Sequence, residues 1–283
     1  MKINTAIFNF LSLASAGLFL ATIFTVAAAT ELCGDFGECK AIIEINSTDG
    51  DIGFHFLMDG DDLNSATIRG PDGAKIFQDM AKGPMTEQKL TETFAESAEP
   101  LCWEAPGEED DWEDIVTLEE FLERWAAGTY TFAGMSDDGK KSEGETELTY
   151  ELPAAPADVD FDGSVISWGA GDDLGNCASY AELSDLVSTN GLPAHPKDVA
   201  VDAYEVVLEP DVDDGDPTGS LKFTIRVPGD ISLKAVTVPA DYLASLPDDT
   251  PVKIEVGAIG GDDNATFTEE DGFCVNEAAG CDD

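Results

Sequence analysis

The chain has 283 residues and carries 59 Asp and Glu against 14 Lys and Arg, a formal net charge of −45 at pH 7. Binding to nucleic acid or to an anionic membrane surface needs clustered Lys and Arg, so this composition argues against both partners. So large a negative charge also requires surroundings in which salt or bound divalent cations screen it.

The N-terminal segment has the pattern of an export signal. Lys2 is the only charged residue before Glu31, an apolar run extends over 7–26, and Ala27-Ala28-Ala29 supplies small residues for cleavage. The alternative is an uncleaved membrane anchor, because the run is nearly long enough to span a bilayer. Interspersed Asn, Ser and Thr dilute the run and favour cleavage. We therefore predict a cleaved signal peptide over 1–29 and a secreted or periplasmic mature protein.

Six cysteines in an exported chain predict disulfide bonds. The simplest pairing closes a local loop at each end and joins the two that remain: Cys33 with Cys39, Cys274 with Cys281, and Cys102 with Cys177. Six cysteines allow about fifteen connectivities, so proximity gives a preference among them.

The first part of the mature chain is predicted to be β-structure. Short β-prone runs at 41–45, 52–58 and 65–68 are separated by Asp-Gly turns at Asp49-Gly50, Asp59-Gly60 and Asp72-Gly73. The pattern then changes. Residues 86–98 are rich in Glu and Ala, with Leu90 and Phe94 at helical spacing, which predicts a helix.

A second helix is predicted from a capping box, Thr117 followed by Glu120. Acidic residues crowd its N-terminal side, where the helix dipole favours anions: Asp110, Asp111, Glu113 and Asp114. Its apolar face consists of Leu118, Phe121, Leu122 and Trp125, and Gly128 is expected to end it. A hairpin follows, with strands at 129–133 and 145–152 around a turn at 136–139.

The stretch 153–156, Pro-Ala-Ala-Pro, is a natural linker between two units. Beyond it the helical pattern nearly disappears. Five β-rich runs follow, separated by turns and acidic loops, at 165–168, 203–208, 221–227, 236–238 and 252–258. Strands at this spacing are typical of a sandwich.

Several residues of this second half match a family pattern. They are Pro156, the strand Val165-Ile166-Ser167-Trp168 with its core Trp, the strand 203–206, Leu246 before Asp249-Thr250, the strand 252–258, Asn264-Ala265-Thr266 and Phe273. On these residues, 153 to about 275 resembles a fibronectin type III domain. The resemblance implies a β-sandwich used for binding or spacing and identifies no ligand.

Two departures from that family stand out. Val252 occupies the position of a Tyr whose hydroxyl usually fixes a corner, so that hydrogen bond is absent. Residues 169–198 form a long insertion after the Trp strand, and an acidic stretch at 209–219 widens another loop.

In the first half, 66–73 and 127–132 resemble pieces of small extracellular β-sandwich modules of bacterial secreted proteins. The predicted fold is therefore mainly β: two tandem β-sandwich domains, the first with one or two short α-helices and the second similar to fibronectin type III. The expected limits are 1–29 for the signal peptide, 30–152 and 157–275 for the domains, and 276–283 for a C-terminal tail.

Gly-Asp-Asp occurs three times, each time with an Asn close behind. The residues are Asp61, Asp62 and Asn64; Asp172, Asp173 and Asn176; and Asp262, Asp263 and Asn264. Calcium sites use such loops, because carboxylates and carbonyls must converge on the ion. The alternative is that Asp, Asn and Gly are simply good turn formers. Residues 158–163 also copy the start of an EF-hand loop, but Gly169 stands where a bidentate Glu is needed.

No motif of nucleophilic or zinc catalysis occurs, and the two histidines, His55 and His195, have no obvious nucleophile beside them. We predict no catalytic residues and no cofactor, calcium being the one candidate ion. The alternative is a carbohydrate-active enzyme or a carbohydrate-binding accessory protein that uses carboxylates and exposed Trp. Trp103 and Trp112, which acids flank, would stack on sugars, although core packing explains them too.

The favoured interpretation is an exported non-enzymatic binding or structural protein that acts in extracellular or cell-envelope interaction, with calcium as a candidate assisting ion. Its expected partners are extracellular proteins or glycans. Nucleic acid and anionic membrane surfaces are not expected partners.

Overall fold

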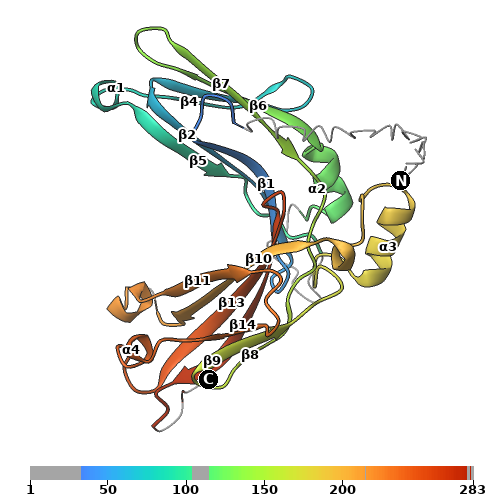
Figure 1. Ribbon diagram of the computed structural model, residues 1–283, viewed down its shortest axis with the longest axis vertical. Helices are drawn as coiled ribbons and strands as arrows, with labels where there is room; N and C mark the ends of the chain where they lie inside the picture. The colour runs from blue at the N-terminus through green and yellow to red at the C-terminus, as the bar shows by residue number, and fades with distance from the viewer. Residues whose placement is uncertain (1–32, 104–114, 214, 279–280, 282–283) are drawn as a thin grey trace, which may run out of the picture. The chain divides into compact units, whose positions relative to one another are not determined.

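The structure is a computed structural model that describes residues 33–103, 115–213, 215–278 and 281 (Figure 1). The predicted signal peptide, the acidic run 110–114 and Trp112 lie outside the described residues. The described chain is mainly β, as the sequence predicts.

The described residues of the first half form seven strands and two short helices. In chain order they are β1 (Glu38–Asn46), β2 (Asp51–Leu63), β3 (Ser65–Arg69), β4 (Lys75–Met80), α1 (Met85–Gln88), β5 (Leu90–Glu96), α2 (Leu118–Arg124), β6 (Gly128–Met135) and β7 (Lys141–Leu148).

In the second half, the residues that the structure describes form seven more strands and short helical segments. They are β8 (Ala157–Phe161), β9 (Val165–Gly169), α3 (Tyr180–Ser188), the 3₁₀ turn η1 (Pro196–Asp198), β10 (Val201–Pro210), the 3₁₀ turn η2 (Pro217–Ser220), β11 (Phe223–Pro228), β12 (Ala235–Thr237), α4 (Ala240–Leu243), β13 (Thr250–Gly260) and β14 (Ala265–Val275).

Each half is a sandwich with its own core. In the first, the sheet β4-β3-β6-β7 packs on β1, β2 and β5, and Phe54 stacks on Trp125 at 4.1 Å between ring centroids. In the second, β12-β9-β8 packs on β10, β13 and β14, and Trp168 lies 5.3 Å from Tyr204. Two β-sandwiches are thus confirmed. Membership of the fibronectin type III family stays a prediction.

One sheet runs through both halves, in the order β11-β10-β13-β14-β1-β2-β5. Its two parts join where β1 pairs in parallel with β14, with Glu44 opposite Ala265 and Asn46 opposite Phe267 (Figure 1). The backbone N–H of Ser47 extends the pairing by donating to Phe267 O at 2.8 Å. We call this parallel pair of strands the β1–β14 seam. The halves are therefore connected by sheet hydrogen bonds as well as by the predicted linker at 153–156.

Three disulfides connect Cys33 to Cys39, Cys102 to Cys177 and Cys274 to Cys281, the pairing that sequence proximity favours. The Cys102–Cys177 bond ties the insertion of the second half to the first half. Leu174, Leu183 and Leu192 from the same insertion belong to the first core.

The helix predicted over 86–98 is wrong. A short helix ends at Gln88, and residues 90–96 form β5, which pairs antiparallel with β2. Leu90 and Phe94 are four residues apart, a spacing that fits both a helix face and one side of a strand. Pairing with β2 therefore decides between two patterns that local sequence leaves equal.

The turn predicted at Asp59-Gly60 is also wrong, because β2 continues to Leu63. The register with β5 shifts between Asp59 and Leu63, so a bulge replaces the turn. Gly60 is required here, since a Cβ at this position would lie 2.7 Å from the Phe36 ring.

The capping-box helix is confirmed at its start, where Thr117 Oγ1 accepts a hydrogen bond from Glu120 N at 3.3 Å. It ends at Arg124, before the expected Gly128, because Trp125 leaves the helix and stacks on Phe54.

The helix α3 inside the insertion was not predicted. Its signal is present in the sequence, because Ser179 and Glu182 have the spacing of a capping box. In the structure Ser179 N donates to Glu182 Oε2 at 2.8 Å, and Leu183 then enters the core.

Candidate functional site

The outward face of the long sheet carries a group of polar side chains close to the β1–β14 seam. In β1, Ile43 and Ile45 point into the core, which turns Glu44 to the other face. In β2, Phe54 and Phe56 point inward, which turns His55 outward beside β1. Glu99 follows β5, in a loop that Ser97 fixes by donating its N–H to Phe54 O at 2.9 Å.

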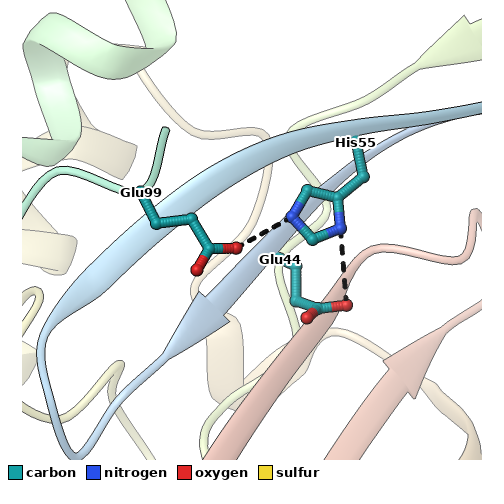
Figure 2. Close-up of side chains that lie close together, drawn as sticks. All are labelled: Glu44, His55 and Glu99. Atoms are coloured by element: carbon teal, nitrogen blue, oxygen red, sulfur yellow. Dashed lines mark hydrogen bonds and ion pairs between the residues drawn. The ribbon is translucent and has the colours of Figure 1, made fainter. Parts of the chain in front are cut away.

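His55 lies between two carboxylates (Figure 2). Its Nε2 is 3.0 Å from Glu99 Oε1, a hydrogen-bond distance, whereas its Nδ1 is 3.9 Å from Glu44 Oε2 and makes no hydrogen bond there. The His55 side chain is only 8% exposed, although it is on the outward face. The rings of Phe94 and His55 pack in a T-shaped arrangement, with 6.1 Å between ring centroids.

Glu44, His55 and Glu99 form the one group in the described part of the chain in which three His, Cys, Asp or Glu ligand atoms lie within 4.8 Å of one another. We call it the Glu–His–Glu cluster. Sequence reasoning placed His55 on a strand between two Phe residues and gave Glu44 and Glu99 no role. Glu99 is distant in sequence and reaches the site only because 90–96 forms a strand, so no local signal could have found it.

The electrostatics of this face are dominated by carboxylates. Burial raises the pKa of Glu44 against the opposing attraction of His55, and the charges of Glu99 and Glu205 raise it further. Burial, together with the charges of Glu99 and Asp49, raises the pKa of Asp51 to about 6. Negative charge is therefore held close together and partly out of water, where each added anion is costly.

The Lys and Arg residues of the same face are paired with other acids. Lys40 Nζ contacts Glu38 at 2.6 Å and Asp263 at 3.2 Å. Lys253 Nζ lies 2.9 Å from Glu269. Within the described residues, the basic group at ion-pair distance from Glu44 and Glu99 is His55.

The three Gly-Asp-Asp segments lie at different places in the fold. The first is at the end of β2, where the Asn64 Oδ1 accepts a hydrogen bond from Lys89 Nζ at 3.2 Å. In the second, Asp173 Oδ1 accepts from Gly175 N at 3.0 Å, and Asn176 Nδ2 donates to Thr48 O.

The third Gly-Asp-Asp segment is the turn between β13 and β14. Asp262 accepts from Thr149 Oγ1 at 2.9 Å, Asp263 pairs with Lys40, and Asn264 is fully buried. Several of these side chains thus take part in turns and ion pairs of the fold. Calcium binding at the three loops stays a prediction.

Two further sequence candidates have structural partners. In 158–163, the three Asp side chains are exposed and Val159 and Phe161 enter the core, as expected for a strand with one solvated face. Trp103 donates its indole N–H to Asp49 O at 3.0 Å and lies against Gly50, which supports the packing interpretation of this residue.

No protein-family model matches the chain, and no curated protein matches it either. Among solved structures, it is similar to a tetra-tandem repeat from the extending region of a large adhesion protein, with 12% identity and a TM-score of 0.25, over 85% of this chain and 50% of that one.

Two other solved structures are similar at the same level. One is a BSP domain of a biofilm-associated protein, at 12% identity and TM-score 0.22, over 87% of this chain and 30% of that one. The other is a solved chain from a 1.5-MDa bacterial ice-binding adhesin, at 11% identity and TM-score 0.22, over 85% of this chain and 65% of the solved chain. The chain thus spans less than two thirds of each of these structures.

Among the described residues, no helix is both long and apolar enough to cross a membrane.

Proposed function

We propose that this chain is an exported, non-enzymatic structural and binding protein that acts outside the cell or in the cell envelope, where it holds its partners under mechanical load. The observation that carries the proposal is the β1–β14 seam, the parallel pairing that makes one sheet of two sandwiches. The predicted export signal and the three disulfides support an oxidising extracellular location.

The geometry of the seam suits a load-bearing role. Because β1 and β14 run parallel, tension between the segment before β1 and the segment after β14 pulls the two strands in opposite directions along their axes. The hydrogen bonds between them are then loaded together in shear, whereas peeling would break them one at a time.

Side chains reinforce the seam beyond its backbone pairs. Thr48 Oγ1 donates to Glu269 O at 2.8 Å, and Glu269 N donates back to Thr48 Oγ1 at 2.9 Å. Thr268 Oγ1 donates to Pro156 O at 2.6 Å and lies 3.1 Å from Ser47 Oγ. The seam is thus tied to the linker as well as to both sandwiches.

The test is single-molecule force spectroscopy on the mature chain, without its signal peptide. Pulling from the N-terminus to the C-terminus shears the seam. Pulling from the N-terminus to a cysteine handle at exposed Lys140 loads the first half and leaves the seam unsheared. We expect a higher rupture force in the first geometry, reduced by Thr268→Val. Equal forces in both geometries would overturn the proposal.

Calcium remains part of the proposal as an assisting ion at the Gly-Asp-Asp loops. Thermal unfolding with calcium, magnesium or chelator at matched ionic strength tests it. The expected result is a rise in melting temperature with calcium alone. An equal rise with sodium would show that calcium acts only by screening the negative charge and not by binding at the loops.

A further inference from the structure

We propose that His55 and Glu44 bind a divalent transition-metal ion of the zinc class, with Glu99 as the outer carboxylate that orients the imidazole. The proposed ion lies between His55 Nδ1 and the Glu44 carboxylate, on the outward face of the sheet beside the β1–β14 seam. Water completes its coordination.

The two nitrogen–oxygen distances assign these roles. Zinc binds imidazole nitrogen at about 2.0–2.1 Å and carboxylate oxygen at about 2.0–2.2 Å, so two such ligands of one ion lie no more than about 4.3 Å apart. The 3.9 Å from Nδ1 to Glu44 Oε2 falls within that limit and is too long for a hydrogen bond. The 3.0 Å from Nε2 to Glu99 Oε1 is a direct hydrogen bond.

The hydrogen bond to Glu99 prepares the imidazole for this role. When Nε2 carries the proton and donates it to Glu99, Nδ1 presents its lone pair toward Glu44. A carboxylate behind a histidine ligand fixes the tautomer and the ring orientation in many metal sites and raises the basicity of the ligand. Burial of the His55 side chain, which is 8% exposed, holds the ring in place.

The imidazole distinguishes this site from the calcium loops. Calcium takes oxygen ligands almost throughout, whereas imidazole suits zinc, copper and nickel. Thiolates do not compete for such an ion, because all six cysteines of the chain are in disulfides. A dication would also offset the carboxylates gathered here, whose neighbouring Lys and Arg pair with other acids.

The experiment uses the tag-free mature chain, stripped with chelator and titrated with zinc by calorimetry. Millimolar calcium is present throughout, so that weak oxygen-only sites on this acidic surface are occupied. We expect one zinc equivalent that calcium does not displace. Glu44→Gln and His55→Gln should abolish it, and Glu99→Gln should weaken it about 10- to 100-fold, as expected for an outer carboxylate.

Two control variants separate the site from general acidity. Glu92→Gln removes an exposed carboxylate of β5 that lies opposite Asp59, farther along the strand from His55, and should leave the zinc affinity unchanged. His195→Gln removes the other histidine of the chain, whose Nε2 lies 3.3 Å from a carbonyl oxygen, Tyr180 O, and should also leave it unchanged.

Nuclear magnetic resonance gives a second measurement that requires no variant. With two histidines in the chain, zinc should shift the ring signals of His55, chiefly at Nδ1, and leave those of His195 in place. Absence of a calcium-resistant zinc equivalent, or persistence of that equivalent in a folded His55→Gln variant, would overturn the proposal. A zinc shift at His195 alone would do so as well.

Discussion

Asn264, in the turn before β14, accepts a hydrogen bond from the backbone N–H of Ile43 in β1 at 2.8 Å. Its amide nitrogen donates to Thr149 O at 3.1 Å and to Glu151 O at 3.3 Å, so one fully buried side chain connects three segments. It belongs to a segment that the sequence marks as a calcium loop, yet its amide is used entirely within the protein.

Replacing this residue should weaken the whole fold. Asn264→Ala leaves the Ile43 N–H and two carbonyl groups without their partner, which should cost about 2–4 kcal/mol. The melting temperature should fall by roughly 5–10 °C, measured by circular dichroism. Gln88→Ala, at an exposed amide of α1, is the control and should change it little. A loss no greater than that of the control would show that the connection contributes nothing.

Stability should also depend on pH through Glu255. Burial raises the pKa of Glu255 from an ordinary 4.5 to about 7, and Glu269 adds to the effect against the attraction of Lys222. The folded protein therefore binds this proton more tightly than the unfolded chain does. The resulting stability is fully present below about pH 4.5 and is lost as pH rises through about 7.

Glu255→Gln should remove that dependence. After allowance for solvent screening, we expect a gain on the order of 1 kcal/mol at pH 8 and little change at pH 5. Urea unfolding at both pH values, in the presence of chelator, measures it. Glu270→Gln, an exposed neighbour on β14, serves as the reference and should show no such difference. A gain of equal size at pH 5 would contradict the assignment.

The disulfides should contribute unequally. Cys102–Cys177 closes a loop of 75 residues and Cys33–Cys39 one of 6, and the cost of loop closure in the unfolded chain rises with length. By this entropic argument, the long bridge should stabilise the fold by about 2 kcal/mol more than the short one. Paired Cys→Ser variants and denaturant unfolding give the comparison. The long-bridge variant should also be the one in which protease cuts near α3.

Salt should raise the melting temperature. A net charge of −45 makes the compact state repel itself, and screening weakens that repulsion. We expect the melting temperature to rise between roughly 10 mM and 0.5 M sodium chloride, with chelator present to exclude divalent ions. An unchanged value over that range would show that the acidic residues are too well dispersed to matter.

What the sequence could predict was local. β-Prone runs bounded by Asp-Gly turns predicted much of β1 and β2 and placed His55 on a strand, and proximity predicted the pairing of Cys33 with Cys39. The β1–β14 seam joins Glu44 to Ala265, and nothing near either residue indicates its partner. The Glu–His–Glu cluster depends on β5, where local propensity pointed to a helix and pairing with β2 prevailed.

Continuity of the sheet through β1 and β14 bears on how this protein can be divided. Produced as separate chains divided at the linker, and so without the Cys102–Cys177 bridge between them, each half would expose a row of backbone N–H and C=O groups along a strand that is interior in the intact chain. Such an edge is a template for pairing with a second molecule. Fragments made at 153–156 should therefore exchange strands or aggregate, and one half supplied to the other should restore the native edge in trans.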